Sequence, residues 1–431
     1  MKITCIGTGY VGLTTGACLA NLGHDVLCMD VDQQKLASIA DGKIPFYEPG
    51  LQELVLENKK KGRLRFTTNS KEAIHFGEVI FNCVWTPNTK KGAADLQAVF
   101  TVTDNIAKFA NGSKVLINKS TVPPGTAQQC HQIVKDSKEK ITIVSNPEFL
   151  KQGNAIYDFN HPDKIVVGAK SPQAFQVLRR VYQGLLKTYI PFLETNWETS
   201  EMIKYANNSF LAMKISFINE IANICGLVDA DVKMVSTAIG MDYRISPKFL
   251  NAGIGYGGSC FSKDVQALVK TAILKGYTPN LLKEVHLSNE RQKKILLPKI
   301  INELEKIKGD TVTIWGLSFK PKTSDLRGAP SLQLIDGLLE KKIKVIVYDP
   351  VALEEAKKIY GHKITYSNIL DDSVKGSNAI VLVTEWDEFR NVNFSDLAKS
   401  MKSKILFDGR NIYQPAQIKE FGFTYHGLGR R

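Results

Sequence analysis

The stretch KITCIGTGYVGLTTGACLANLGHDVLCMD, residues 2–30, decides how the N-terminal part of this chain folds. It opens with a short apolar run, Lys2–Ile6, and passes through GTGYVG at 7–12 into a helical pattern. It closes on a second apolar run that ends at Asp30. A glycine-rich turn between a strand and a helix is typical of a dinucleotide-binding strand–helix–strand unit.

Each residue type in this turn suits a pyrophosphate. Gly7 permits the tight turn, Gly9 lets the backbone approach the ligand, and Gly12 allows close packing of helix on strand. The helix N-terminus at Tyr10 and Val11 supplies N–H donors and the positive end of the helix dipole. The alternative is a glycine-rich turn in a domain that binds no nucleotide.

Asp30 argues against that alternative. It follows Gly12 by 18 residues and ends the second strand, where a carboxylate can accept hydrogen bonds from both ribose hydroxyls. The same carboxylate would repel a 2′-phosphate, so the sequence predicts NAD rather than NADP.

The composition of the 431 residues excludes several classes of protein. A hydrophobic fraction of 43% supports two or three domains with real cores, which excludes a disulfide-stapled miniprotein or a disordered tail. The seven cysteines form no CxxC pair and no Cys/His cluster at metal-ligand spacing, so we expect a reduced compartment and no metal. Glycines interrupt the apolar N-terminus, and no run approaches the roughly 18 apolar residues of a membrane span. We therefore expect a cytoplasmic protein.

The charge balance leaves the class of partner open. Lys and Arg number 56 against 43 Asp and Glu, a surplus that permits nucleic acid, an anionic membrane surface or a phosphorylated small molecule. The lysines are dispersed, and no basic face carries interleaved aromatic residues. We expect neither a nucleic-acid nor a membrane partner.

Strand-like runs occur in two groups separated by a helical region. The first group comprises Lys2–Ile6, Asp25–Asp30, Val79–Val84, Lys114–Lys119, Thr142–Val144 and Lys164–Val167, and the second comprises Thr311–Trp315, Lys344–Tyr348, Ala379–Val383 and Lys404–Phe407. Between them, 201–226 lacks proline and internal glycine, which predicts a long helix. The prediction is an α/β protein with two Rossmann-like, doubly wound parallel sheets joined by a helical connector. The expected domains are 1–197, 198–308 and 309–431.

The stretch GIGYGGSCFSKD at 253–264 holds one cysteine, Cys260, at the start of an expected helix. Glycines allow backbone to approach a ligand closely, and a helix N-terminus with a nearby lysine favours the thiolate. A single cysteine is more often an inert core residue. Its glycine-rich setting reverses that expectation here.

Several long motifs in order identify a family resemblance over essentially the whole chain. They are GTGYVG at 7–12, STVPPGT at 120–126, NPEFL at 146–150, HPDKIVVG at 161–168, EMIKYANNSFLAMKISFINE at 201–220, DYRI at 242–245, GYGGSCFSKD at 255–264, WGLSFKPKTSDLR at 315–327 and DGRN at 408–411. The chain resembles the UDP-glucose/GDP-mannose dehydrogenase family. The resemblance makes 1–197 the NAD-binding domain, 198–308 the dimerisation region with the Cys260 loop, and 309–431 the UDP-sugar-binding domain.

The resemblance implies a four-electron oxidation of UDP-glucose to UDP-glucuronate with two NADH formed. An aldehyde does not readily lose hydride until a nucleophile adds to it, and a thiolate adduct supplies the required tetrahedral carbon. On this resemblance Cys260 is the nucleophile that forms the thiohemiacetal and then the thioester. The same chemistry on another nucleotide sugar, UDP-N-acetyl-mannosamine or GDP-mannose, stays open.

The resemblance also implies catalytic partners for Cys260. Lys204 and Asn208 are four residues apart on one helix face and match family positions that stabilise oxyanions. A blander interpretation pairs Lys204 with Glu201 on a solvated face. The positions expected to handle the general base and the hydrolytic water are Asp264, Glu148 and Thr121.

Further matched positions define the expected binding sites. The cofactor set adds Lys35, Thr86, Thr121, Lys263 beside the diphosphate and Arg327 on the nicotinamide side. The substrate set comprises Glu148, Phe149, Leu150, Lys204, Asn208, Phe249, Leu250, Gly257, Phe319 and Lys320, together with Arg244, which is expected to reach the substrate of an opposing subunit. An apolar stripe through Ile203, Phe210, Met213, Phe217 and Ile221 suits a homodimer or a higher homo-oligomer, or packing within the chain.

Three residues depart from the family pattern. Trp85 stands where a glycine is usual, in a loop near the cofactor, so cofactor affinity is in question. Ser262 replaces a common proline, and Gln152 replaces a common glutamate. None of these changes removes a residue expected to carry chemistry.

Overall fold

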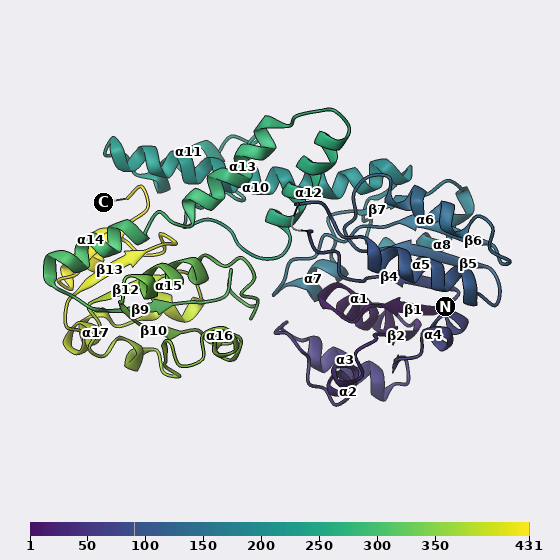
Figure 1. The fold of residues 1–431 in the computed structure, drawn as a ribbon, viewed down its shortest axis with the longest axis horizontal. Coiled ribbons are helices and arrows are strands. Elements are labelled where there is room, and N and C mark those ends of the chain that lie inside the picture. Colours follow the sequence, from purple (N-terminus) through teal and green to yellow (C-terminus); the bar gives the residue numbers. More distant parts are fainter. Residues whose placement is uncertain (90, 431) are drawn as a thin grey trace. The chain divides into compact units, whose positions relative to one another are not determined.

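The computed structural model describes residues 1–89 and 91–430 of the chain. They form two compact units (Figure 1). The first unit contains Met1–Asn207 and Gln266–Tyr277, and the second contains Asn208–Val265 and the chain from Thr278 onward.

The first unit contains an eight-stranded sheet with the order β3-β2-β1-β4-β5-β6-β7-β8. Its strands are β1 (Lys2–Ile6), β2 (Asp25–Met29), β3 (Leu64–Thr67), β4 (Val79–Asn82), β5 (Lys114–Asn118), β6 (Ile141–Ser145), β7 (Ile165–Gly168) and β8 (Phe192–Thr195). The order reverses between β1 and β4, which places the ligand crevice of such a sheet at the carboxyl ends of these two strands.

Strands β1 to β6 are parallel, but β7 pairs with β6 in the antiparallel sense through Ser145 and Gly168, and β8 is parallel to β7. The predicted parallel sheet is therefore confirmed, with one antiparallel pairing, between β6 and β7, that the sequence did not indicate. Apolar runs predict strands without predicting their direction, which depends on the connection. The chain between β6 and β7 contains a loop and the short helix α7 (Ala155–Asn160) in place of a long crossover helix.

Helices cover both faces of this sheet, as expected for a doubly wound fold. They are α1 (Tyr10–Asn21), α2 (Gln33–Ala40), α3 (Leu51–Lys60), α4 (Ser70–Phe76), α5 (Gln97–Phe109), α6 (Thr126–Val134), α7, α8 (Pro172–Val181) and α9 (Gln183–Leu186). Side chains alternate along β1, so Ile3 and Cys5 enter the core beneath α1, whereas Ile6 enters the core beneath α5 and α6.

The second unit repeats the same topology with six parallel strands in the order β11-β10-β9-β12-β13-β14. The strands are β9 (Thr311–Trp315), β10 (Lys344–Tyr348), β11 (Thr365–Tyr366), β12 (Ala379–Leu382), β13 (Ile405–Asp408) and β14 (Thr424–Gly427). The flanking helices are α14 (Leu297–Ile307), α15 (Pro330–Glu340), α16 (Leu353–Tyr360), α17 (Phe394–Ser400) and α18 (Pro415–Glu420), with short 3-10 turns η1 (Asp371–Val374) and η2 (Asp387–Asn391). The predicted pair of Rossmann-like sheets is confirmed.

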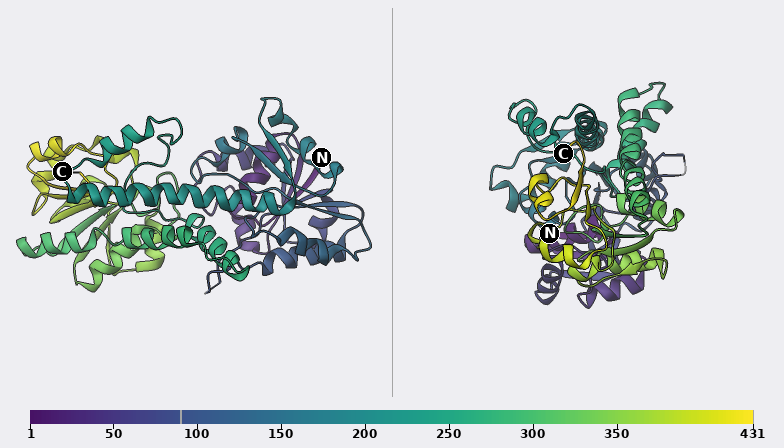
Figure 2. Two further views of the ribbon diagram at one scale, coloured as in Figure 1. Left: turned by 90° about the horizontal axis from the view of Figure 1, so that it is seen from above. Right: turned by 90° about the vertical axis from the view of Figure 1, so that its left-hand side faces the viewer.

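The connector is helical, as predicted. It contains α10 (Trp197–Leu227), α11 (Val232–Gly240), α12 (Phe261–Leu274) and α13 (Asn280–Gln292). Helix α10 is continuous over 31 residues (Figure 2), starts in the first unit and ends in the second.

Helix α10 is also long and apolar enough, by length and composition alone, to cross a membrane. The sequence expectation concerned an unbroken apolar run, whereas α10 meets a criterion of mean hydropathy with polar residues interspersed. Polar residues along the helix nevertheless bond to the rest of the protein: Ser216 donates to the Val285 carbonyl at 3.1 Å, and Asn223 donates to Gln292 at 2.8 Å. Core helices that pack within a protein pass the same length and composition test.

Candidate active site

The turn between β1 and α1 has no room for side chains at two of its three glycines. Gly7 has a φ of 92°, and a Cβ there would lie 2.9 Å from the Cys83 carbonyl oxygen. A Cβ on Gly12 would lie 1.8 Å from the Gly7 carbonyl oxygen. A Cβ on Gly9, by contrast, would meet no protein atom within 4 Å, so the backbone at the start of α1 is accessible to a pyrophosphate. Tyr10 and Val11 form the first turn of this helix.

Asp30 follows β2 directly and belongs to the same site. Its Oδ2 accepts hydrogen bonds from the Thr8 amide at 2.8 Å and the Thr8 hydroxyl at 2.7 Å, and pairs with Lys35 at 2.6 Å. Burial on its own raises the pKa of Asp30, but the bonds from Lys35 and Thr8 outweigh it and lower the pKa to about 2. The carboxylate is therefore ionised and ready to accept ribose hydroxyls, so the turn and Asp30 fit NAD.

Asp349 occupies the equivalent position after β10 in the second unit, but it has a different environment. It is 1% exposed, and its oxygens accept from the amides of Leu317, Ser318, Val351 and Ala352 and from the Trp386 indole. A carboxylate so occupied has no access to a ribose. The second sheet thus repeats the fold of the dinucleotide site without its acceptor.

The loop that contains Thr121 is held by hydrogen bonds at two places. Thr86 donates to the Thr121 carbonyl at 2.9 Å. Further along, the Glu201 carboxylate on α10 accepts from the Gly125 and Ala127 amides, both at 2.7 Å, at the start of α6. Burial raises the pKa of Glu201 and outweighs these backbone bonds, which lower it. The net pKa is about 7.

Lys204 does not pair with Glu201. Its ammonium lies 3.0 Å from the Glu148 carboxylate, and the two side chains are only 5% and 7% exposed. The Phe149 ring lies 5.2 Å from the Lys204 nitrogen, and the Leu150 amide donates to Glu148 at 2.5 Å. The solvated pairing of Lys204 is therefore wrong, and NPEFL and Lys204 form one buried charged group.

In the second unit, Cys260 immediately precedes α12 and is exposed, whereas the other six cysteines are buried. The glycines before it allow close backbone packing. A Cβ on Gly257 would lie 2.6 Å from the Gly328 carbonyl, and one on Gly258 would lie 2.8 Å from the Phe319 ring. The Gly258 amide donates to the Arg327 carbonyl at 2.8 Å, which fixes the loop.

Asp264 lies one helical turn after Cys260 and is 1% exposed. Its carboxylate accepts from the Asn208 amide group at 2.7 Å and pairs with Lys263 at 2.5 Å. The structure therefore brings Asn208, Lys263 and Asp264 together in the second unit.

Arg327 and Lys320 lie on the segment after β9. Arg327 pairs with Asp325 at 2.6 Å, and this pair together with the negative field of Cys260 raises the pKa of the guanidinium. The Lys320 ammonium lies 5.8 Å from the ring of Phe319.

Arg410 was not among the predicted site residues. Its guanidinium donates to the Val383 carbonyl at 2.6 Å, to the Phe319 carbonyl at 3.3 Å and to the Gly255 carbonyl at 3.4 Å. It thereby holds the Cys260 loop and the Phe319 segment to β12. Its place in the DGRN motif was the available signal in the sequence.

The remaining predicted residues lie as follows. Arg244 is exposed and pairs with Asp242 at 2.6 Å. Phe249 has a φ of 64°, and Leu250 is buried. Trp85 is 51% exposed on the loop after β4.

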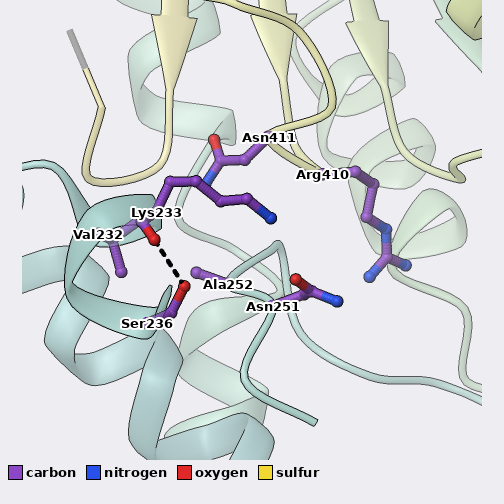
Figure 3. Close-up of a pocket in the computed structure, with 7 residues that line it drawn as sticks. All are labelled: Val232, Lys233, Ser236, Asn251, Ala252, Arg410 and Asn411. Carbon is purple, nitrogen blue, oxygen red and sulfur yellow. Dashed lines mark hydrogen bonds between the residues drawn. The ribbon is translucent and has the colours of Figure 1, made fainter. Parts of the chain in front are cut away.

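A small pocket within the second unit lies beside the Leu250 segment (Figure 3). Two cationic side chains and two amides line it, and the full set is Val232, Lys233, Ser236, Asn251, Ala252, Arg410 and Asn411. Of these side chains, the Arg410 guanidinium is already engaged by three backbone carbonyls and by Glu385.

Each unit thus holds part of the predicted set. The first contains the glycine turn, Asp30, Lys35, Thr86, Thr121, Glu148, Phe149, Leu150 and Lys204, and the second contains Asn208, Arg244, Phe249, Leu250, Gly257, Cys260, Lys263, Asp264, Phe319, Lys320 and Arg327.

Comparison with family models gives three consecutive matches. They are the NAD binding domain of the UDP-glucose/GDP-mannose dehydrogenase family at residues 1–186, its central domain at 198–291 and its UDP binding domain at 313–415.

Individual proteins match over the full chain. The UDP-glucose 6-dehydrogenase TuaD of Bacillus subtilis is 42% identical, over 100% of this chain and 93% of the relative. The UDP-glucose 6-dehydrogenase of Rhizobium meliloti is 42% identical over 100% of both chains. Among solved structures, a UDP-glucose dehydrogenase from Pyrobaculum islandicum is 31% identical, with a TM-score of 0.92 over 100% of this chain and 98% of that chain. A UDP-D-ManNAc dehydrogenase from Pyrococcus horikoshii is 26% identical, with a TM-score of 0.87 over 100% and 99%.

Proposed function

Because this chain belongs to the UDP-glucose/GDP-mannose dehydrogenase family, we propose that it oxidises UDP-glucose to UDP-glucuronate with NAD as the oxidant. The observation that carries the proposal is the set of catalytic residue types on both units: a buried Lys204–Glu148 pair, a buried Asn208–Asp264 pair and an exposed Cys260 at a helix start. The reaction consumes one water and two NAD and forms two NADH.

NAD would be held by the glycine turn, by Asp30 and by Lys35, with Thr86, Thr121, Lys263 and Arg327 completing the site. Bound NAD supplies the acceptor for one electron pair in each of the two oxidations. The turn contributes backbone N–H groups, and Asp30 contributes an ionised acceptor that selects against a 2′-phosphate.

Cys260 carries the covalent part of the reaction. After the primary alcohol has become an aldehyde, the thiolate sulfur forms a bond to the aldehyde carbon and gives a thiohemiacetal. Loss of a second electron pair and a proton converts the adduct to a thioester. Water then cleaves the carbon–sulfur bond, which releases the carboxylate and returns the thiolate.

The buried hydrogen-bond donors and carboxylates act while the reacting carbon is tetrahedral, in the thiohemiacetal and during thioester hydrolysis. Lys204 and Asn208 donate hydrogen bonds to the oxygen that becomes an alkoxide, and each is already oriented by a carboxylate, Glu148 or Asp264. Asp264, Glu148 and Thr121 are the groups that orient or deprotonate the hydrolytic water.

The nucleotide sugar would lie against residues of three predicted binding segments. Glu148, Phe149 and Leu150 come from NPEFL, Phe249, Leu250 and Gly257 from the segment before Cys260, and Phe319 and Lys320 from the segment after β9. Arg410, which bonds to both Gly255 and Phe319, keeps the last two segments in register.

The test that decides the covalent mechanism is Cys260→Ser. Steady formation of NADH from UDP-glucose should fall by at least about a thousandfold, because the second oxidation loses its nucleophile. Binding of NADH, followed by fluorescence, provides the control for folding. Undiminished turnover would contradict the thioester route.

The second candidate is the same oxidation of another nucleotide sugar, favoured by the similarity to the UDP-D-ManNAc dehydrogenase. A panel of UDP-glucose, UDP-N-acetyl-mannosamine and GDP-mannose, each assayed by NADH absorbance, distinguishes the two. A kcat/KM for UDP-glucose below that of either competitor would reverse the assignment.

We also propose a cytoplasmic homodimer built from the domains 1–197, 198–308 and 309–431. Exposed apolar side chains on α10 support the dimer, since Phe210 is 58% and Phe217 is 51% exposed. In the dimer, Arg244 would reach the substrate of the opposing subunit. The six buried cysteines form no disulfide, which supports a reduced compartment.

A further inference from the structure

Glu48 is a buried carboxylate that none of the reaction steps above uses. It lies between α2 and α3, is 6% exposed, and accepts hydrogen bonds from two separate parts of the first unit. One is the Tyr10 hydroxyl at 2.9 Å, at the first residue of α1. The other is the pair of backbone amides of Gly153, at 2.5 Å, and Ala155, at 2.7 Å.

The Tyr10 hydroxyl is held in place as a donor to Glu48. The Tyr10 ring packs 5.4 Å from the Phe46 ring, and burial together with Glu48 raises the pKa of the phenol, which therefore keeps its proton and donates. Hydrogen bonds to a buried carboxylate are among the stronger ones in proteins, so the bridge resists opening.

The amide side of the bridge leads directly to Glu148. Gly153 follows Glu148 by five positions in the sequence. The Leu150 amide donates to Glu148 at 2.5 Å within this short loop, and the Lys151 amide donates to Asp158 on α7 at 2.8 Å. A shift of Gly153 is therefore transmitted to the segment that contains Glu148, Phe149 and Leu150.

We propose that Glu48 is a positioning residue that couples the cofactor turn to the segment Glu148–Leu150. This rests on the proposed function, which places NAD on the turn and the nucleotide sugar against that segment. A ligand that orders Tyr10 then orders Glu148–Leu150 through Glu48, and the coupling is reciprocal: UDP-glucose tightens NADH binding by the same factor as NADH tightens UDP-glucose.

The first experiment is a double-mutant cycle on binding. The dissociation constant of NADH is measured with and without UDP-glucose, a pair that does not react, for wild type, Tyr10→Phe, Glu48→Gln and the double variant. We expect UDP-glucose to tighten NADH on the order of fivefold in wild type, each single substitution to lower this factor toward one, and the double to lower it no further. Tyr157→Phe, which makes the same change on a 59% exposed tyrosine of α7, should retain the factor.

Two further readouts separate positioning from general damage. Tyr10→Phe, although it lies at the cofactor turn, should raise the KM for UDP-glucose more than it lowers kcat. In hydrogen–deuterium exchange, NADH should slow the exchange of the 148–155 backbone amides in wild type and in Tyr157→Phe. The slowing should be much smaller in Tyr10→Phe.

The outcomes distinguish this inference from the proposed function. The exchange experiment needs no turnover. A failure to oxidise UDP-glucose would therefore contradict the proposed function, while the exchange rates of the 148–155 amides would still test the Glu48 bridge. Full NADH-dependent slowing in Tyr10→Phe, or additive effects of the two substitutions, would overturn the bridge. If Glu48→Gln does not fold, the comparison of Tyr10→Phe with Tyr157→Phe decides alone.

Discussion

Exposure sets Cys260 apart from the six other cysteines. All seven lie among the residues that the structure describes, and Cys260 is the one whose side chain is exposed. A small alkylating reagent needs access to a thiolate, and buried thiols do not react while the fold is intact.

Iodoacetamide should therefore modify one thiol per chain and abolish turnover at the same rate. Mass spectrometry of the peptide containing Cys260 measures the modification, and NADH formation measures activity. Cys260→Ser should take up no label under the same conditions. Labelling of two or more cysteines before activity is lost would contradict the assignment.

Glu201 gives the first unit a pH-dependent stability. Burial raises its pKa from the ordinary 4.5 to about 7, so the folded protein binds this proton more tightly than the unfolded chain does. The resulting stabilisation is complete below about pH 4.5 and is lost as the pH rises through about 7.

Glu201→Gln removes this titration, because glutamine stays neutral. The difference in unfolding free energy between wild type and variant, measured with urea, should fall by on the order of 3 kcal/mol between pH 4.5 and 8. Glu220→Gln, at an exposed position of the same helix, should show no such change. A pH-independent difference for Glu201→Gln would contradict the raised pKa.

At the scale of elements, helix α10 carries a row of exposed apolar side chains. Phe210, Phe217 and Ile224 recur every seven residues and are 58%, 51% and 49% exposed. An apolar stripe with this spacing suits a second helix packed alongside it.

Phe217→Asp should convert the proposed dimer to a monomer, because it places a charge in the interface. The substitution should change the stability of the monomer by less than about 0.5 kcal/mol, as is usual for exposed positions. Light scattering after size exclusion measures the mass. Ile359→Asp, at a 52% exposed position of α16, is the matched control and should leave the mass unchanged.

The strands show what sequence patterns can predict at this scale. Central strands such as β4 and β12 are buried at every position, and their unbroken apolar runs predicted them within two residues. The unpredicted strands β3, β8, β11 and β14 lie at the sheet edges, and none of them is buried at every position. Half-exposed strands carry mixed residues, so their pairing depends on the neighbouring strand more than on their own composition.

At the scale of the whole molecule, two related sheets carry aspartates at equivalent positions. Asp30 bonds to Lys35 and Thr8 at the cofactor turn, whereas Asp349 is enclosed by amides and the Trp386 indole. We therefore propose that this position serves ligand binding in the first unit and stability in the second.

Asp30→Asn should raise the KM for NAD roughly tenfold and improve the use of NADP relative to NAD, because the charge that repels a 2′-phosphate is lost. Asp349→Asn should leave the KM for NAD unchanged and lower the unfolding free energy by about 2–3 kcal/mol, because buried donors lose a charged acceptor. Steady-state kinetics and urea unfolding measure the two effects. An equal effect of both substitutions on the KM for NAD would contradict this division.

The candidate site was predictable to the extent that its residues lie in contiguous motifs. Cys260, Lys204 and Asp30 were found in this way. Two carboxylates that hold nearby backbone were not predicted, because Glu48 and Glu201 each bond to backbone amides far along the chain, and no local pattern specifies such a contact. The pairing of Lys204 with Glu148 rather than Glu201 likewise depends on tertiary packing.

The glycine turn has a consequence for heredity. Every missense change of codon 12 adds a Cβ that collides with the Gly7 carbonyl, so such alleles should behave as recessive nulls that yield no folded product. A missense change of codon 9 collides with no protein atom and should yield a folded subunit that rejects the cofactor. In the proposed dimer, such a product would still supply its intact Arg244 to a normal copy, so the allele should remove only its own site and act as a partial loss of function.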